Sequence, residues 1–557
     1  MKVALVTTPP SIRSGIGDYT RHLLPYLREH CDVRCFVEHG HDEEAWGDID
    51  VAPISELNPR DYDQLLYQLG NELAHSFMPR MIRAVGGTVM QHDWVLFDMA
   101  MNAFPALFRG GAKGHMLALR EGGLQQASIY AHNWLDRRRQ RTSAVPAVLD
   151  PSLPGVFLGG WYASEEAGRW VSDYATLRIP SDTVRKVEIE LHSDPGRRVR
   201  VYEGSKVLAE GGAGAHLVEP TANRPLLIIE TTGIRITKIQ RSHGDARRMG
   251  SFVYKIRYED ESGEHQLDMQ QKPAVPNLPV SLSRDRFRLP MNRSVVRFAD
   301  SFIVHSNYVG DLIRAERNAN TAMGVLHHGS EFRWRDEDRK ITRRSLGLEG
   351  EWPDSFMVVS FGGVQPHKRI DKALLALAEA RKERKDIRLV LAGSLHSREF
   401  DPIATAKALG LEDAVHFTGF LPEQKAWEWL HAGDFSLNLR GPSSGGTSGG
   451  IFQSFSVGRP VIVSNACEQT ELPDSCVVKI PLDDTEVTSL AKTIVELRDD
   501  GARRANLEAA TRTFVENECH WGIVAKQYAE LMEGFPHPRC TRKSVVAMRL
   551  AVRRSAL

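Results

Sequence analysis

Residues 441–450 read Gly-Pro-Ser-Ser-Gly-Gly-Thr-Ser-Gly-Gly, and an apolar run stands on either side of them. The run before, Asp434–Arg440, has the pattern of a buried strand, and the run after, Ile451–Val457, that of a short helix. Gly458 and Pro460 end this helix, and Val461–Val463 begins another buried strand. The loop is therefore predicted at the carboxyl edge of a parallel sheet, where open α/β sheets bind ligands.

The composition of the loop favours a phosphate group as that ligand. The first N–H groups of a helix have no partner within the helix, and the hydroxyls of Thr447 and Ser448 stand beside them. Glycines without a Cβ atom let a ligand approach the backbone. A glycine-rich loop is also a common plain connection, so this reading stays open at this point.

The whole chain has the composition of a soluble protein of several domains. It has 557 residues, and its 71 Lys and Arg balance 71 Asp and Glu, so no net charge favours nucleic acid as a partner. The six cysteines match no zinc or disulfide spacing, which predicts a reducing cytoplasm and no metal site. No apolar run is long enough to span a bilayer, and the first residues do not resemble a signal peptide.

The order of patterns predicts an α/β protein with two Rossmann-like domains facing a cleft and an inserted antiparallel β-sandwich. Strand and helix patterns alternate in both α/β parts, whereas short alternating runs with turn signals fill the insert. The predicted domains are 1–150 with 276–325 (the first Rossmann-like domain), 151–275 (the insert), 326–520 (the second Rossmann-like domain), 521–535 (a closing helix) and 536–557 (a basic tail).

The insert and the tail suggest further partners. Trp161, Tyr162 and Trp170 in the insert are read as core residues, with stacking on sugar rings or homo-oligomer formation as alternatives. The tail is basic without an acidic residue and is read as disordered, because its apolar residues form no clean helical stripe. Such a tail is a candidate for peripheral contact with anionic lipid.

A second glycine motif accompanies a lysine. Ser360–Phe361 ends a strand, Gly362–Gly363 forms a turn, and Lys368 precedes a helix. An ammonium at this place can face a diphosphate on the 446–450 loop and stabilise its negative charge as a leaving group. Read alone, Lys368 is equally well a solvated lysine at a helix start.

Four stretches together resemble the retaining glycosyltransferases of family 4, group 1 type, which have the GT-B fold. They are Ser14–Thr20, Gly362–Lys368, Asp413–Phe420 and residues 445–464. The resemblance implies transfer of a sugar, with retention of configuration, from a nucleotide-diphosphate sugar to a glycan or lipid-linked acceptor. It also implies that the reaction needs no metal ion.

The resemblance also implies roles for residues. The catalytic candidates are His92, Asp93 and Lys368. The donor-binding candidates are Gly17, Gly362, Gly363, Lys368, Gly419, Phe420, Leu421, Thr447, Ser448, Gly449, Gln453 and Glu471. The acceptor-binding candidates are Gly15, Gly17, Asp18, Tyr19, Asn71 and His75. For Glu471, capping of a local turn is the alternative.

The sequence departs from the family at three positions. Gly363 stands where the family has an arginine, and Gly445 and Gln453 stand where it has two glutamates. A shift of the alignment by one puts Gly446 in place of the first glutamate. The amide of Gln453 can still accept a hydrogen bond from a hydroxyl, but the arginine and the first glutamate have no evident replacement. A catalytically degenerate protein that binds a nucleotide or glycan is therefore the alternative function.

Overall fold

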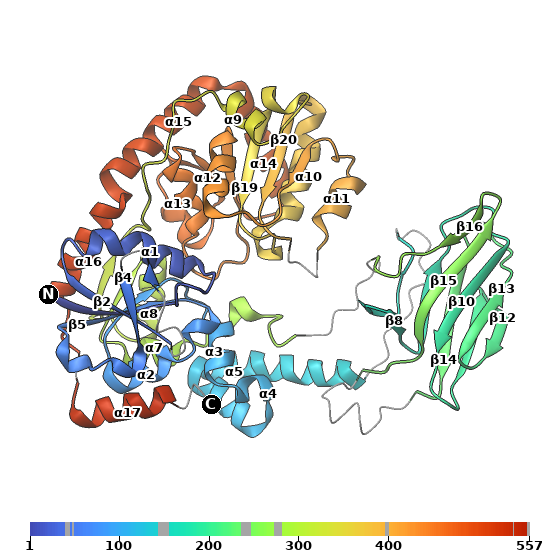
Figure 1. The fold of residues 1–557 in the computed structure, drawn as a ribbon, viewed down its shortest axis with the longest axis horizontal. Helices are drawn as coiled ribbons and strands as arrows, with labels where there is room; N and C mark the ends of the chain where they lie inside the picture. Colours follow the sequence, from blue (N-terminus) through green and yellow to red (C-terminus); the bar gives the residue numbers. More distant parts are fainter. Residues whose placement is uncertain are drawn as a thin grey trace. The chain divides into compact units, whose positions relative to one another are not determined.

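The computed structural model describes residues 1–38, 45–46, 49–142, 155–234, 247–271, 281–395, 400–538 and 540–553. The chain forms two compact units, one of residues 1–129 with 285–557 and a smaller one of residues 130–284. The larger unit contains two largely parallel sheets covered by helices, and the smaller unit contains two antiparallel sheets (Figure 1). The α/β class predicted for both ends of the chain is confirmed.

The N-terminal half of the larger unit is built on an eight-stranded sheet of order β18-β17-β6-β5-β1-β2-β4-β3. Its strands pair in parallel except for β3, which is antiparallel to β4. The strands are β1 (Lys2–Val6), β2 (Asp32–Val37), β3 (Ala45–Trp46), β4 (Ile49–Pro53), β5 (Gln64–Leu69), β6 (Thr88–Gln91), β17 (Ser301–Val304) and β18 (Ala322–Val325).

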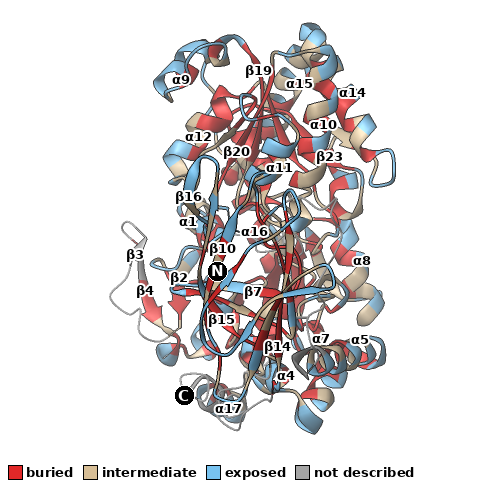
Figure 2. Ribbon diagram, turned by 90° about the vertical axis from the view of Figure 1, so that its right-hand side faces the viewer, coloured by how far each residue is buried: buried red, intermediate tan, exposed pale blue. Residues whose placement is uncertain are grey.

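Helices cover both faces of this sheet, because alternate residues of a strand point to opposite sides. Val3 and Leu5 pack with one group of helices, and Ala4 and Val6 pack with another. Buried residues accordingly fill the strands (Figure 2). The helices of this half are α1 (Gly15–Leu27), α2 (Met78–Val85), α3 (Phe97–Ala103), α4 (Ala106–Arg109), α5 (Gly111–Thr142), α7 (Arg293–Phe298) and α8 (Asn307–Glu316). Helix α5 extends into the smaller unit and is interrupted at Gly123, whose φ is 73°.

The C-terminal half is built on a six-stranded parallel sheet of order β21-β20-β19-β22-β23-β24. Its strands are β19 (Phe356–Phe361), β20 (Ile387–Ala392), β21 (Val415–Phe417), β22 (Phe435–Asn438), β23 (Val461–Ser464) and β24 (Val477–Ile480). Its helices are α9 (Arg339–Ser345), α10 (Ile370–Glu383), α11 (Pro402–Ala408), α12 (Glu423–Ala432), α13 (Gly449–Ser456), α14 (Glu486–Asp499) and α15 (Gly501–Phe514). The predicted unit of strand, glycine loop and helix is β22, residues 439–448 and α13.

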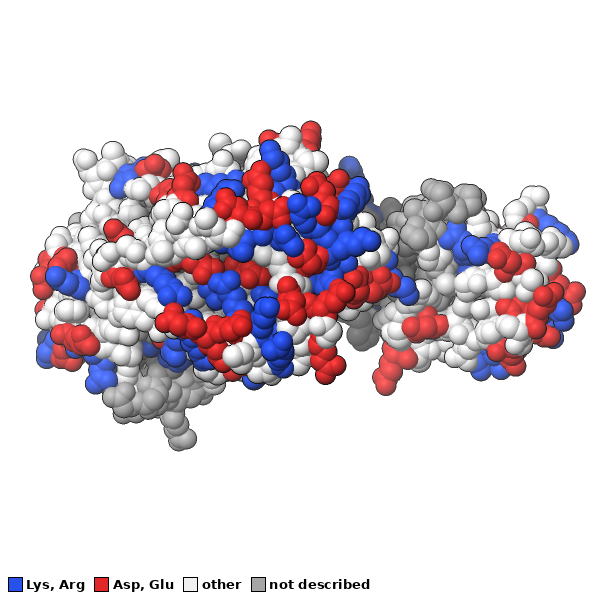
Figure 3. All heavy atoms as spheres, turned by 90° about the horizontal axis from the view of Figure 1, so that it is seen from above, with Lys and Arg blue, Asp and Glu red and all other residues white. Residues whose placement is uncertain are grey.

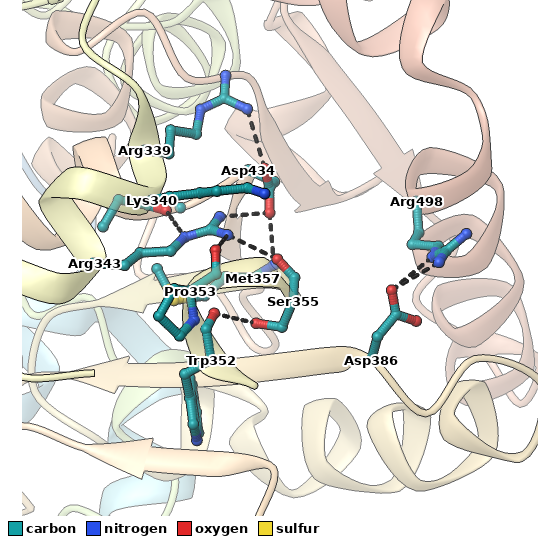
Figure 4. A network of polar contacts seen from close by, with 12 residues as sticks. Arg339, Lys340, Arg343, Trp352, Pro353, Ser355, Met357, Asp386, Asp434 and Arg498 are labelled. Carbon is teal, nitrogen blue, oxygen red and sulfur yellow. Dashed lines mark hydrogen bonds and ion pairs between the residues drawn. The ribbon is translucent and has the colours of Figure 1, made fainter. Parts of the chain in front are cut away.

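Ion pairs connect the helices of this half to the amino ends of its strands. Basic and acidic side chains alternate over the face that Figure 3 shows. Asp434, directly before β22, accepts hydrogen bonds from Arg343 at 2.7 Å, from Arg339 at 3.1 Å and from the N–H of Met357 at 2.7 Å (Figure 4). Arg343 also donates to the carbonyls of Pro353 and Ser355. This network stabilises the edge of the sheet at the amino ends of its strands, opposite to the edge that carries the predicted glycine loop. Its charged groups are hydrogen-bonded within the protein and therefore support the fold.

Helix α16 (Trp521–Gly534) returns the chain to the N-terminal half. Its Trp521, Val524, Tyr528 and Met532 belong to the same core as Val3 and Leu5. Tyr528 also shares a hydrogen bond of 3.0 Å with the hydroxyl of Tyr19 in α1. The closing helix predicted for residues 521–535 therefore completes one face of the first sheet.

The prediction of a disordered tail is wrong for the part of it that the structure describes. Residues Arg542–Arg553 form helix α17, which packs on α2. Met548 is fully buried in the core of the N-terminal half, and Val545 is buried as well. The spacing of 545 and 548 is one helical turn, a signal that the larger number of basic residues around it obscured.

In the smaller unit, two antiparallel sheets share one buried core, at the place where the sequence predicts a β-sandwich. Their orders are β13-β10-β15-β8-β7, with β16 on β15, and β12-β11-β14-β9. The strands are β7 (Trp161–Glu165), β8 (Gly168–Val171), β9 (Tyr174–Arg178), β10 (Lys186–His192), β11 (Arg198–Glu203), β12 (Lys206–Gly211), β13 (Gly214–Val218), β14 (Leu226–Thr232), β15 (Phe252–Asp260) and β16 (Gly263–Gln266). Trp161 is a core residue, since it is fully buried and donates to the carbonyl of Thr176.

Candidate functional site

A cavity of about 490 Å³ lies between the two halves of the larger unit, at the carboxyl ends of both sheets. Its N-terminal wall is the start of α1, with Gly15, Asp18, Tyr19 and His22. Its C-terminal wall contains the predicted Gly362, Gly363, Lys368, Ser448, Gly449 and Gln453, together with Arg440. The structure thus brings both predicted glycine motifs of the C-terminal half to one space.

Lys368 faces this cavity from the short 3-10 turn Pro366–Lys368. Its ammonium lies 3.5 Å from the carbonyl of Phe361, and a Cβ atom on Gly362 would stand 2.4 Å from that ammonium. Gly362 also has a φ of +103°, so this position requires glycine for two reasons. Burial and the neighbouring guanidinium of Arg440 lower the pKa of Lys368 to about 7.

Arg440, which the sequence reasoning did not single out, supplies a second cation. It follows β22 directly and donates to the hydroxyl of Ser448 at 2.9 Å and to His367 at 2.8 Å. Its Nε is buried and has no hydrogen-bond partner. The signal in the sequence was an arginine at the end of the apolar run Asp434–Arg440.

Among the described residues, no acidic side chain forms an ion pair with either cation. The guanidinium of Arg440 acts on Lys368, and the more distant carboxylates of Glu468 and Asp93 act on Arg440. Glu468 is occupied by the hydroxyl of Ser443 at 2.8 Å. His367 between the cations remains neutral, since burial and Arg440 lower its pKa to about 3. The site therefore has an excess of positive charge inside the protein, which an anion would balance.

Two further groups on this wall are available to a ligand. Helix α13 begins at Gly449, and the side chain of Ser448 before it makes no capping hydrogen bond. The first N–H groups of a helix have no partner within the helix and attract anions. The Oε1 of Gln453 is buried and has no hydrogen-bond partner among the described residues, so it can accept a hydrogen bond from a ligand hydroxyl.

The N-terminal wall is less charged. A Cβ atom on Gly15 would meet nothing within 4 Å, so the backbone faces open space there. Asp18 is half-exposed, and its pKa is raised by partial burial and by the carboxylate of Glu423. The ring of Tyr19 is buried and contacts His92, His328 and Trp521 at centroid distances of 4.6, 4.8 and 4.9 Å.

His22 connects α1 with the C-terminal half. Its Nδ1 lies 2.6 Å from Glu331 and its Nε2 lies 2.7 Å from Glu423. Although burial opposes the charge, the two carboxylates raise the pKa of His22 to about 9. A protonated His22 at neutral pH therefore holds the two halves together at the mouth of the cavity.

Two glycines of the loop, Gly445 and Gly446, allow the loop to pack closely against the N-terminal half. A Cβ atom on Gly446 would stand 2.2 Å from a carboxylate oxygen of Asp93, and one on Gly445 would stand 2.6 Å from the Cβ of Trp94. Ser444 donates to Asp93 at 3.0 Å and accepts from the N–H of Val95 at 2.9 Å. The expectation that these glycines admit a ligand is therefore wrong for 445 and 446, where the N-terminal half fills the space.

Several candidates of the N-terminal half lie in its interior and do not line the cavity. His75 is fully buried between the hydroxyl of Thr8 at 2.8 Å and the N–H of Gly70 at 3.0 Å, and burial lowers its pKa to about 4. The amide of Asn71 accepts from the N–H groups of Asp98 and Met99 at the start of α3. These two predicted acceptor residues support the fold.

His92 and Asp93 lie close behind the wall. His92 pairs with Gln68 at 2.7 Å, and burial together with neighbouring histidines holds its pKa well below 6.5. Asp93 accepts from the N–H of Asn71 at 3.1 Å as well as from Ser444. Burial raises the pKa of Asp93, and neither side chain lines the cavity.

The remaining donor candidates are distributed around the cavity. Gly17 packs against Ser14 and Thr8 inside α1. Phe420 is exposed beneath the guanidinium of Arg13 at 4.6 Å. Gly419, Leu421 and Thr447 lie beyond the cavity lining.

Glu471 has another partner. Its carboxylate accepts from the N–H groups of Asn307 at 2.8 Å and Tyr308 at 2.6 Å. These groups are the free donors at the start of α8. The carboxylate therefore caps a helix of the N-terminal half and is not among the residues that line the cavity, and its place near the nucleotide stays a prediction.

Two further properties concern the described residues. They contain no group of three or more His, Cys, Asp or Glu side chains arranged to hold a metal ion. None of their helices combines the length and the hydrophobicity needed to cross a membrane.

Comparison with known proteins identifies the C-terminal half. Residues 346–514 match the family model of glycosyl transferases group 1. A relative from Corynebacterium glutamicum is 27% identical over 207 residues, which are 36% of this chain and 52% of the relative. That relative is a GDP-mannose-dependent monoacylated alpha-(1-6)-phosphatidylinositol monomannoside mannosyltransferase, and the match spans about half of its length. The chain therefore carries a group 1 glycosyltransferase domain, as the resemblance predicts.

Solved structures give a weaker likeness. Alr3699/HepE of Anabaena in complex with UDP is 20% identical, with 46% of this chain and 70% of that chain covered and a TM-score of 0.39. WaaG, a glycosyltransferase involved in lipopolysaccharide biosynthesis, is 17% identical, with coverage of 45% and 68% and a TM-score of 0.38.

Proposed function

We propose that the chain transfers a sugar from a nucleotide-diphosphate sugar to a glycan or lipid-linked acceptor, with retention of configuration. The diphosphate would lie against Lys368, Arg440 and the start of α13 in the cavity between the halves. The acceptor would enter from the side of α1, where Gly15 and Asp18 line the same space.

One observation carries this proposal, namely two half-buried cations that no carboxylate contacts among the described residues. Removing Lys368 from water beside Arg440 costs free energy, and the lowered pKa of Lys368 reflects that cost. A ligand with two negative charges at the start of α13 would recover this free energy. Sites that perturb the pKa of a lysine in a cleft in this way are commonly functional.

The chemistry follows from the position of the charges. When the bond between sugar and diphosphate breaks, negative charge develops on the leaving oxygen, and cations placed in advance stabilise it. Lys368 and Arg440 would supply this charge, so the proposal includes no metal ion. The Oε1 of Gln453, which has no hydrogen-bond partner among the described residues, would accept a hydrogen bond from a hydroxyl of the nucleotide or sugar.

The relative suggests the kind of substrate. Its name states a GDP-mannose donor and a phosphatidylinositol mannoside acceptor, so a GDP-linked hexose and a lipid-linked glycan are the first candidates here. Such an acceptor would be used at the cytoplasmic face of a membrane.

A thermal-shift screen against UDP, GDP, ADP and their common sugars tests the donor site. A ligand that binds the folded state at 100 times its Kd stabilises it by about 2.7 kcal/mol, so one nucleotide should raise the melting temperature by several degrees. Lys368→Ala should abolish the shift, whereas Lys382→Ala on the exposed side of α10 should preserve it. No shift with any nucleotide, or an equal shift in Lys368→Ala, would contradict the proposal.

A second function deserves a test, because the loop 441–450 contributes no carboxylate to the cavity. The positions of the family's first glutamate, Gly445 or Gly446, are filled by Trp94 and Asp93 of the N-terminal half. A protein that binds the nucleotide without using it would show the same thermal shift. Release of nucleoside diphosphate from the bound donor, measured with and without a lipid extract, separates the two, since only an enzyme releases it in repeated turnovers.

A further inference from the structure

A groove of about 820 Å³ on the N-terminal half is separate from the cleft cavity. It lies between α2, α4 and the first part of α5. Five basic residues line it, namely Arg80, Arg83, Arg109, Lys113 and Arg120. None of the described residues that line it is acidic, although Glu121 lies directly behind, buried and bound to Arg120 and Ser294.

The chain around this groove is free of acidic residues over a long stretch. From Met99 to Arg120 the sequence contains no Asp or Glu, although a quarter of the whole chain is charged with both signs in balance. Elsewhere, as on the face in Figure 3, basic side chains alternate with acidic ones. Glu121, which ends this stretch, pairs with Arg120, whereas Arg109 and Lys113 have no acidic neighbour within the stretch.

Large apolar side chains are exposed on the same segment. The exposed fractions are 58% for Phe108, 64% for Met116, 44% for Leu119 and 82% for Leu124. In α5 the core contact is made instead by Leu117 and Ala118, so Met116 and Leu119 belong to the opposite, outward side. A helix of a water-soluble surface normally presents polar residues there, so a grouped apolar surface indicates a binding partner.

The combination of charge and apolar surface identifies that partner. A helix with basic residues beside exposed Phe, Leu and Met fits the boundary between lipid headgroups and acyl chains. An acidic protein surface would satisfy the charges, but it would not require four large apolar side chains along one short segment.

We propose that this groove binds the phosphate headgroups of anionic phospholipids, while the apolar residues of α4 and α5 enter the membrane interface. The inference deepens the proposed function, on which it rests for the acceptor side: it would place the N-terminal half at the membrane that holds a lipid-linked acceptor. It also moves the predicted membrane contact away from the tail, because Val545 and Met548 of α17 are buried against the protein.

Vesicle flotation with the full chain tests the inference without using the donor site. We expect binding to vesicles of phosphatidylcholine with phosphatidylglycerol, and much weaker binding to phosphatidylcholine alone. Arg109→Glu/Lys113→Glu should reduce the partition coefficient at least about 20-fold, since each basic residue near an anionic surface contributes roughly fivefold. Met116→Ser/Leu124→Ser should also reduce it, because both side chains are exposed and their loss leaves the core intact.

Two controls separate the possible outcomes. Lys382→Glu/Lys492→Glu reverses two exposed charges on the C-terminal half and should leave vesicle binding unchanged. Lys368→Ala should bind vesicles normally even if it loses nucleotide, so failure of the donor site would not be mistaken for failure of the groove.

Three results would overturn the inference. One is the absence of binding to anionic vesicles, and another is equal binding by the groove variants and the wild type. The third is light scattering that shows a dimer which Met116→Ser/Leu124→Ser dissociates, because the apolar surface would then join two copies of the chain.

Discussion

In the two halves of the larger unit, the polar residues considered for the site differ in their partners. In the N-terminal half, His75, Asn71 and Asp93 are each satisfied by backbone or side-chain partners within the protein. In the C-terminal half, Arg440 and Gln453 keep buried polar atoms without a partner. Both sheets have the same architecture, and both sets of residues follow buried strands or open the helices after them.

This difference teaches where a ligand is expected. A buried polar atom costs free energy unless it is hydrogen-bonded, so an open atom beside a cavity indicates a place where a ligand can bind. In the C-terminal half, Arg440 and Gln453 keep such atoms at the cavity, whereas the open atoms of Gln91 and His305 in the N-terminal half lie outside the cavity lining. A polar residue type at the end of a strand therefore predicts a binding site less well than the observation that a buried polar atom beside a cavity has no hydrogen-bond partner within the protein.

The largest effect on this comparison is expected from His75→Ala. Truncation leaves a cavity and removes the partners of Thr8 and Gly70, so the free energy of unfolding should fall by about 3 kcal/mol. Nucleotide affinity should not change. Urea unfolding and calorimetric titration measure the two quantities, and a stable variant that no longer uses its acceptor would show that His75 is a ligand residue after all.

Arg440→Gln should give the opposite pattern. A charge-assisted hydrogen bond contributes about 1.5–3 kcal/mol, so the affinity for the nucleoside diphosphate should fall roughly 10- to 100-fold. Stability without ligand should be unchanged or slightly higher, because a buried unpaired charge is removed. If Arg440→Gln unfolds the protein and leaves the affinity intact, the guanidinium is structural and the contrast between the halves disappears.

The smallest effect is the pH dependence that Lys368 gives to binding. Its pKa is about 7 in the free protein, and a bound diphosphate raises it, so binding is coupled to uptake of a proton. Affinity should be highest below pH 7 and fall above it, by no more than about tenfold per pH unit. The difference between wild type and Lys368→Ala isolates this dependence from ionisation of the nucleotide, and parallel profiles would argue against a role for Lys368.

Much of the fold could be predicted from periodicity. The buried runs at Val3–Val6, Phe356–Phe361 and Val461–Val463 lie in strands β1, β19 and β23, because a parallel sheet covered on both faces requires continuous apolar runs. Helix α13 begins two residues earlier than predicted, at Gly449, since the helix includes both glycines of its first turn.

The site could be predicted only in part. Lys368 and Ser448 were found from local motifs, but the role of Arg440 depends on His367 and Ser448, which the sequence separates from it. The cap that Glu471 makes on α8 joins residues more than 160 positions apart, and no local pattern contains such a contact. Contacts of this kind are set by how the two halves meet, which a single sequence does not contain.

The return of α16 to the first sheet has a consequence for synthesis. Tyr528 and Met532 complete the core around Val3 and Leu5, so strand β1 is covered on this face only after residues 521–534 have been made. During translation the C-terminal half can close as soon as α15 is available, while one face of the earlier half waits for residues 521–534. A ribosome-bound chain that stops before Trp521 should therefore expose that apolar face and recruit chaperones, although its group 1 domain is already folded.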